Sequence, residues 1–161
     1  AYAMTGWRIG YGAGPQPLIN AMAILQSQST THASSLSQEA AVVALEGPQN
    51  FIKEWVKVYT DRRDKTLDIL NKTPGLTCLK PQGAFYLFPS CVGLMGKKTP
   101  SGTRITSDTD LAAYLLESAG VAVVPGAAFG LSPYFRISYP IDTNILLEAC
   151  NRISQAIQLL K

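Results

Sequence analysis

Residues 1–15 read AYAMTGWRIGYGAGP, and this stretch decides the organisation of the chain. Its apolar residues at positions 7, 9 and 11 alternate with Arg8 and Gly10, and a period of two predicts a half-buried strand. The glycines and the proline at 12–15 predict a turn from which a helix can start. Because the chain opens directly in strand-like material and without a methionine, we expect it to be a fragment of a longer protein.

Helical patterns follow this opening. Apolar spacing predicts one helix around 18–25 and a second that begins at a capping box of Ser35 and Gln38 and ends at Gly47. A third helix is predicted over 48–72, with an apolar stripe along its length. Such a helix would span about 37 Å, which is typical of a helix that joins two bodies, and we place a domain junction on it.

The pattern changes beyond residue 72. Strand-like runs and helices alternate, so residues 73–161 are predicted to form a compact α+β unit. Residues 93–106 are polar and contain glycine and proline, which favours a mobile surface loop. The other elements are predicted at 76–79, 84–88, 107–120, 121–124, 134–139 and 142–160.

Composition excludes several classes of function. The net charge of the 161 residues is +3, and the basic residues are scattered, so no nucleic-acid surface is expected. No apolar run is long enough for a membrane span, and no signal peptide is evident. The chain has a single histidine, His32, and its three cysteines are widely spaced and form no C-x-x-C pair, so we expect neither a metal site nor a disulfide framework. Such cysteines fit a reducing cytoplasm.

Two arginines are the candidate binding residues. Arg8 lies in WRIGY and Arg136 in YFRISY, and each is the only charge in an apolar, aromatic stretch. A guanidinium cannot lose its proton, so a buried one needs an anion, and its planar fork suits a carboxylate or a phosphate. The alternative is an arginine on an edge strand whose head reaches water while its stem packs.

The motifs together resemble a known family. The stretch AYAMTGWRIGYGAGP is similar to the segment that follows the cofactor lysine in fold-type I pyridoxal-phosphate (PLP) aminotransferases of the aspartate aminotransferase family, and the similarity continues through SQST, PQGAFYLFP, VAVVPGAAFG and YFRISY. The resemblance implies an α/β fold with an α+β part. Residues 1–47 would be the C-terminal piece of the large PLP-binding domain, 48–72 the interdomain helix and 73–161 the small domain.

The resemblance also implies roles for residues. Arg8 would bind the PLP phosphate, and Arg136 would bind the carboxylate of the substrate. The Schiff-base lysine of the family would precede Ala1, so we expect no catalytic residue in this chain and no activity from the chain alone. His32 stands where such relatives usually have asparagine, in a loop that reaches the neighbouring subunit. The implied parent is a cytoplasmic homodimer acting on an amino acid, aspartate- or glutamate-like, and a 2-oxo acid.

Two alternatives stay open on the sequence. The chain could be a non-catalytic folded fragment that associates with itself, because a strand without its sheet tends to pair with another copy. It could also belong to a PLP-dependent lyase or synthase of the same fold, since Arg8 and Arg136 would serve such an enzyme equally well.

Overall fold

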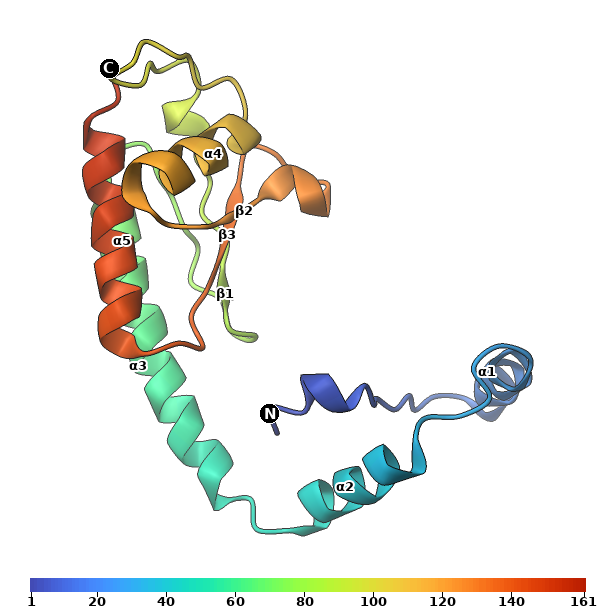
Figure 1. The fold of residues 1–161 in the computed structure, drawn as a ribbon. Helices are drawn as coiled ribbons and strands as arrows, with labels where there is room; N and C mark the ends of the chain where they lie inside the picture. The colour runs from blue at the N-terminus through green and yellow to red at the C-terminus, as the bar shows by residue number, and fades with distance from the viewer. The chain divides into compact units, whose positions relative to one another are not determined.

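The computed structural model describes residues 1–161 and divides them into two units, Ala1–Val56 and Lys57–Lys161 (Figure 1). The division falls inside α3 (Asn50–Lys72), so the long helix predicted over 48–72 is present and contributes to both units. The assignment of 1–47, 48–72 and 73–161 to the domains of a larger protein stays a prediction.

The N-terminal unit is helical and contains no strand. It consists of the 3₁₀ turn η1 (Thr5–Trp7), α1 (Gln16–Gln28), α2 (Ser35–Glu46) and the first turns of α3. The strand predicted around residues 7–11 is therefore wrong. A strand needs a hydrogen-bonded neighbour, and none of the three strands of the chain pairs with this stretch.

Hydrogen bonds tie the opening segment to the helices that follow it. The Ser37 hydroxyl on α2 donates to the carbonyl of Trp7 over 2.8 Å, and the Tyr2 hydroxyl donates to Oε1 of Gln49 over 2.8 Å. The capping box predicted at the start of α2 does not form, because Ser34 is the N-cap and the Gln38 amide donates instead to the carbonyl of Ala33.

The N-terminal unit buries no hydrophobic side chain. Its only buried residue is Ser37, whereas α1 and α2 expose much of their apolar surface. Helices in a folded domain normally cover one apolar face. The apolar faces of α1 and α2 are left uncovered within this chain, most clearly at Leu18, Met22, Ile24, Leu25, Leu36 and Val43.

The C-terminal unit is built on a three-stranded antiparallel sheet with the order β1-β3-β2. The strands are β1 (Tyr86–Leu87), β2 (Val124–Pro125) and β3 (Phe135–Ser138), with Tyr86 opposite Ser138 and Val124 opposite Arg136. The helices α4 (Asp108–Ala119) and α5 (Thr143–Gln158) complete the unit, with α4 packed on α5 and on β2. In Figure 1 the sheet stands beside α4 and α5.

All buried hydrophobic residues of the chain belong to this unit, between Leu70 and Leu160. The helix starts match the sequence pattern: Asp142 caps α5, and Ser107 with Asp110 forms a capping box on α4. The strands are shorter than predicted. Residues 76–79 form only an isolated bridge, from Thr77 to Ser90.

The segment 93–106, predicted to be a mobile surface loop, is a hairpin held by backbone hydrogen bonds. It contains the end of the 3₁₀ turn η2 (Val92–Leu94), and Gly96 donates to the carbonyl of Ile105 over 2.8 Å. Leu94 and Ile105 are fully buried in the core. Two apolar anchors and paired backbone groups thus fix this segment on the C-terminal unit. None of the helices of the chain is long and apolar enough to span a lipid bilayer.

A first prediction concerns Gly126, the first residue of the 3₁₀ turn η3 (Gly126–Phe129). A Cβ at this position would collide with the carbonyl oxygen of Leu131 and lie 2.8 Å from Cβ of Tyr134. Gly126→Ala should therefore lower the free energy of unfolding by about 1–3 kcal/mol, measured from denaturant midpoints. The matched control is Gly83→Ala, since a Cβ there meets nothing within 4 Å. Equal stability of the two variants would contradict the packing at η3.

A second prediction concerns the free cysteines Cys78, Cys91 and Cys150, which are all buried. Burial raises the pKa of the Cys150 thiol to about 11, and burial together with the charge of Asp108 raises that of Cys91 to about 12. In the folded protein at pH 8 the thiols should react with a disulfide reagent far more slowly than in denaturant. Because folding favours the neutral thiols, their contribution to stability is complete below pH 9 and is lost as the pH rises towards 11–12. Fast labelling of the folded chain would refute this packing.

Candidate functional site

Arg136 lies in the middle of the central strand β3. Its neighbours Phe135 and Ile137 point into the core, so the alternation of the strand places the Arg136 side chain on the opposite face of the sheet. Two aromatic rings flank the guanidinium there: its central carbon lies 4.4 Å from the ring centre of Tyr86 on β1 and 4.6 Å from that of Phe129 on η3. The guanidinium is thus held in contact with two rings, in the geometry of cation–π attraction.

The guanidinium of Arg136 has no anionic partner within the chain. It takes part in none of the five ion pairs, and its Nε–H is buried without a hydrogen-bond acceptor. A buried donor left unpaired costs about 1–3 kcal/mol, and the charge cannot be removed by deprotonation. The N–H groups of a guanidinium point outward in its plane, so a planar anion such as a carboxylate can pair with them at the edge.

Further aromatic residues support this site. Phe88 stacks on Tyr134, with ring centres 5.3 Å apart and an angle of 10° between the planes. Phe88 also meets the ring of Phe129 edge to face at 6.0 Å. These contacts form a partly exposed aromatic layer beside Arg136.

Arg8 lies in a different setting from the one predicted. It follows η1, is exposed, and has the left-handed backbone conformation with φ 51° that non-glycine residues rarely adopt. Its guanidinium donates only to the carbonyl of Thr5, over 3.2 Å, and it forms no ion pair with a carboxylate. The strand in which Arg8 was expected does not form, and the guanidinium reaches water. Its donors remain available to an anion from outside the chain.

The two arginines belong to different units, Arg8 to Ala1–Val56 and Arg136 to Lys57–Lys161. Their meeting in one site stays a prediction. The sequence reasoning did not assign Tyr86 and Phe129 to the site. A signal was present, since both lie in the aromatic motifs PQGAFYLFP and VAVVPGAAFG, but only the fold brings them to Arg136.

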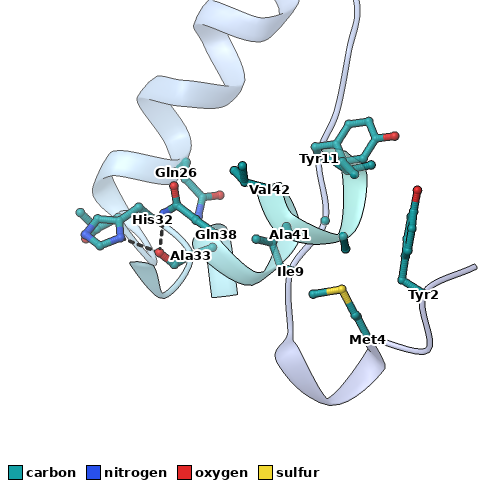
Figure 2. Close-up of a pocket in the computed structure, with 14 residues that line it drawn as sticks. Tyr2, Met4, Ile9, Tyr11, Gln26, His32, Ala33, Gln38, Ala41 and Val42 are labelled. Carbon is teal, nitrogen blue, oxygen red and sulfur yellow. Dashed lines mark hydrogen bonds between the residues drawn. The ribbon is translucent and has the colours of Figure 1, made fainter. Parts of the chain in front are cut away.

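The N-terminal unit contains a cavity of about 700 Å³ between its opening segment and the helices α1 and α2 (Figure 2). His32 lines this cavity, and its Nδ1 lies 2.7 Å from the carbonyl oxygen of Ala33, which also accepts from the Gln38 amide. No group of three or more histidine, cysteine or acidic side chains is arranged to hold a metal ion. The remaining polar lining is from Tyr2, Tyr11, Gln26 and Thr31.

Comparison with known proteins places the chain among aminotransferases. The profile of the family described as "Aminotransferase class I and II" matches residues 1–153. The aspartate aminotransferase of Rhizobium meliloti (strain 1021) is 59% identical over 156 residues, covering 97% of this chain and 38% of that protein. The aspartate/prephenate aminotransferase of Cereibacter sphaeroides is 53% identical over 153 residues, covering 95% of this chain and 38% of that protein.

Solved structures agree with these relatives. The crystal structure of the Rhizobium meliloti aspartate aminotransferase superposes with a TM-score of 0.92 at 58% identity, covering 100% of this chain and 40% of that one. The Thermus thermophilus aspartate aminotransferase with maleate gives a TM-score of 0.81 at 37% identity, covering 96% of this chain and 38% of that one.

The chain spans about two fifths of the length of these relatives. Within that span the match runs through nearly all of its residues, in sequence and in structure. The fold expected from the resemblance, a mixed helical and small-sheet part of the fold-type I architecture, is confirmed. This chain belongs to the class I and II aminotransferase family.

Proposed function

We propose that this chain supplies the anion-binding residues of a PLP-dependent aminotransferase, which moves an amino group between an amino acid and a 2-oxo acid. The observation that carries the proposal is the guanidinium of Arg136, which contacts the rings of Tyr86 and Phe129 and has a buried Nε–H without an acceptor in the chain. The carboxylate of an amino acid or of a 2-oxo acid would pair with this guanidinium and fix the orientation of the substrate.

The cofactor proposal rests on Arg8. Its guanidinium is exposed, is close to no carboxylate and is anchored only at the carbonyl of Thr5, so its donors fit the phosphate group of PLP. When bound, PLP supplies an electron sink that weakens the bonds at Cα of the amino acid. We assign no residue of this chain to proton transfer; its part is to bind and to orient.

Substrate and assembly are proposed from further observations. The names of the relatives, aspartate aminotransferase and aspartate/prephenate aminotransferase, favour an aspartate- or glutamate-like amino donor. The uncovered apolar faces of α1 and α2 support a homodimer as the functional state. Three buried free thiols fit the reducing cytoplasm.

A second candidate function is non-catalytic self-association of the chain, and the same apolar faces favour it. The two candidates differ in what Arg136 does, since self-association through α1 and α2 makes no use of it. The relatives described above are aminotransferases, so no observation favours a lyase or a synthase.

The third prediction tests Arg136 in the full-length protein that carries this chain. Arg136→Lys keeps the positive charge but loses the two parallel N–H donors with which a guanidinium binds a carboxylate. The value of kcat/KM for the amino donor should therefore fall about 10²-fold or more, while the absorbance of bound PLP is retained. Arg152→Lys is the control, because Arg152 pairs only with Glu148 on the exposed side of α5. Unchanged kcat/KM in Arg136→Lys would exclude the assigned role.

The fourth prediction tests Arg8. Arg8→Gln should weaken PLP binding at least tenfold in equilibrium dialysis, because one charge-assisted contact to the phosphate is lost. Arg104→Gln removes the same charge from an exposed residue of the 93–106 hairpin and should leave PLP affinity unchanged. If both variants bind PLP as tightly as the unaltered protein, Arg8 does not hold the phosphate.

A further inference from the structure

The position of Phe129 depends on η3, a short turn that has no side-chain cap at its start. Phe129 is 49% exposed, so the core does not fix its ring as it fixes a buried residue. The ring nevertheless lies 4.6 Å from the guanidinium carbon of Arg136, and the ring of Tyr86 lies 4.4 Å from the same carbon. The backbone of η3 therefore helps to determine whether Arg136 keeps both aromatic contacts.

The backbone of η3 is held by one side chain. Oδ2 of Asp108 accepts a hydrogen bond from the N–H of Ala127 over 2.9 Å, and no other side chain bonds to the residues of the turn. The remaining bonds are between backbone groups: Gly126 donates to the carbonyl of Tyr134, Gly130 to that of Ala127 and Leu131 to that of Gly126. Asp108 thus makes the only side-chain hydrogen bond between η3 and α4.

Asp108 is an unusual residue to find at this place. Its side chain is 1% exposed, yet it forms no ion pair with lysine or arginine. A buried carboxylate is costly unless it is hydrogen-bonded, and its place as the first residue of α4 offsets part of the cost through the helix dipole. The start of α4 does not require it, because Ser107 and Asp110 already form the capping box.

We propose that Asp108 is a positioning residue for the carboxylate site: by tethering the N–H of Ala127 it holds Phe129 against Arg136, so that an anion can reach only the edge of the guanidinium. The proposal rests on the proposed function of Arg136 as the substrate-carboxylate residue. Asp108 contacts neither substrate nor cofactor in this scheme; it acts through η3 and Phe129. Loss of this hydrogen bond would leave Phe129 held only by the backbone bonds of η3 and by its edge-to-face contact with Phe88, so the ring could move away from Arg136.

The test uses three variants of the full-length protein. Asp108→Ala removes the acceptor, whereas Asp108→Asn keeps an amide oxygen that can accept from Ala127. Asp110→Ala is the matched control: it removes a carboxylate from the same first turn of α4 and breaks the capping box, but it does not contact η3. All three are measured for KM of the amino donor, kcat, PLP affinity and thermal midpoint.

We expect Asp108→Ala to raise KM about tenfold with a smaller fall in kcat and with PLP affinity unchanged. Asp108→Asn should restore KM to within threefold of the unaltered protein, and Asp110→Ala should lower the thermal midpoint without raising KM. A rise in KM in Asp110→Ala equal to that in Asp108→Ala would overturn the proposal, because general weakening of α4 would then explain both.

A second readout does not depend on activity. The Nε–H of Arg136 gives a proton–nitrogen NMR signal that the rings of Tyr86 and Phe129 displace, and Arg136→Lys identifies it by its loss. Asp108→Ala should move this signal and Asp110→Ala should not. If the signal stays in place in Asp108→Ala, the positioning role is refuted even when Arg136 proves essential. If the signal moves but Arg136→Lys leaves kcat/KM unchanged, the tether stands and only the proposed function of Arg136 fails.

Should Asp108→Ala not fold, Phe129→Leu serves instead, since it removes the ring and leaves the carboxylate of Asp108 bonded to Ala127. This variant should raise KM and move the Arg136 signal by itself. No change in either measurement would overturn the proposal, because the tether acts on Arg136 only through this ring.

Discussion

The aromatic residues on one face of the C-terminal sheet are arranged around a single positive group, the guanidinium of Arg136. The positive charge of a guanidinium calls for an anion, and the sheet places the guanidinium of Arg136 against two aromatic rings, with its Nε–H buried and unpaired. The central strand β3 presents it, the edge strand β1 supplies Tyr86, and the turn η3 supplies Phe129. A stability argument alone would not retain such an arginine, since an apolar residue would pack there without an unpaired donor. Under the proposed function, the unpaired donor is kept because a carboxylate binds to it.

The two units differ in how much of their apolar surface they bury. Every buried hydrophobic residue lies between Leu70 and Leu160, and the helices α4 and α5 both start at side-chain caps. The N-terminal unit buries only Ser37 and exposes the apolar residues of α1 and α2. Burial of apolar surface is the main favourable term in folding, so the C-terminal unit has its own source of stability and the N-terminal unit has little.

Local patterns predicted what depends on local interactions. The spacing of apolar residues over 142–160 anticipated α5, and the alternation over 134–139 anticipated β3, because each pattern reports which face meets the core. The strand around Arg8 failed because pairing needs a neighbour that sequence spacing does not reveal. The aromatic neighbours of Arg136 could not be predicted either. The sequence indicated the arginine, but Tyr86 lies on β1 and Phe129 on η3, and only the folded sheet brings them together. Motif resemblance identified the family where spacing alone could not.

Both ends of the last helix, α5, are fixed by hydrogen bonds. Asp142 fixes its first turn, and just beyond its end the backbones of Lys161 and Lys98 exchange two hydrogen bonds of 2.8 and 2.9 Å. Each residue advances an α-helix by about 100° of rotation. One residue inserted into or deleted from α5 between Leu146 and Ile153 would rotate these two buried side chains relative to each other. The Asp142 cap and the backbone pair of Lys98 and Lys161 fix the two ends, so a shift of the helix could not compensate. Length variation in this part of the chain is therefore confined to the surface turns, whereas the helix itself behaves as a spacer of fixed size.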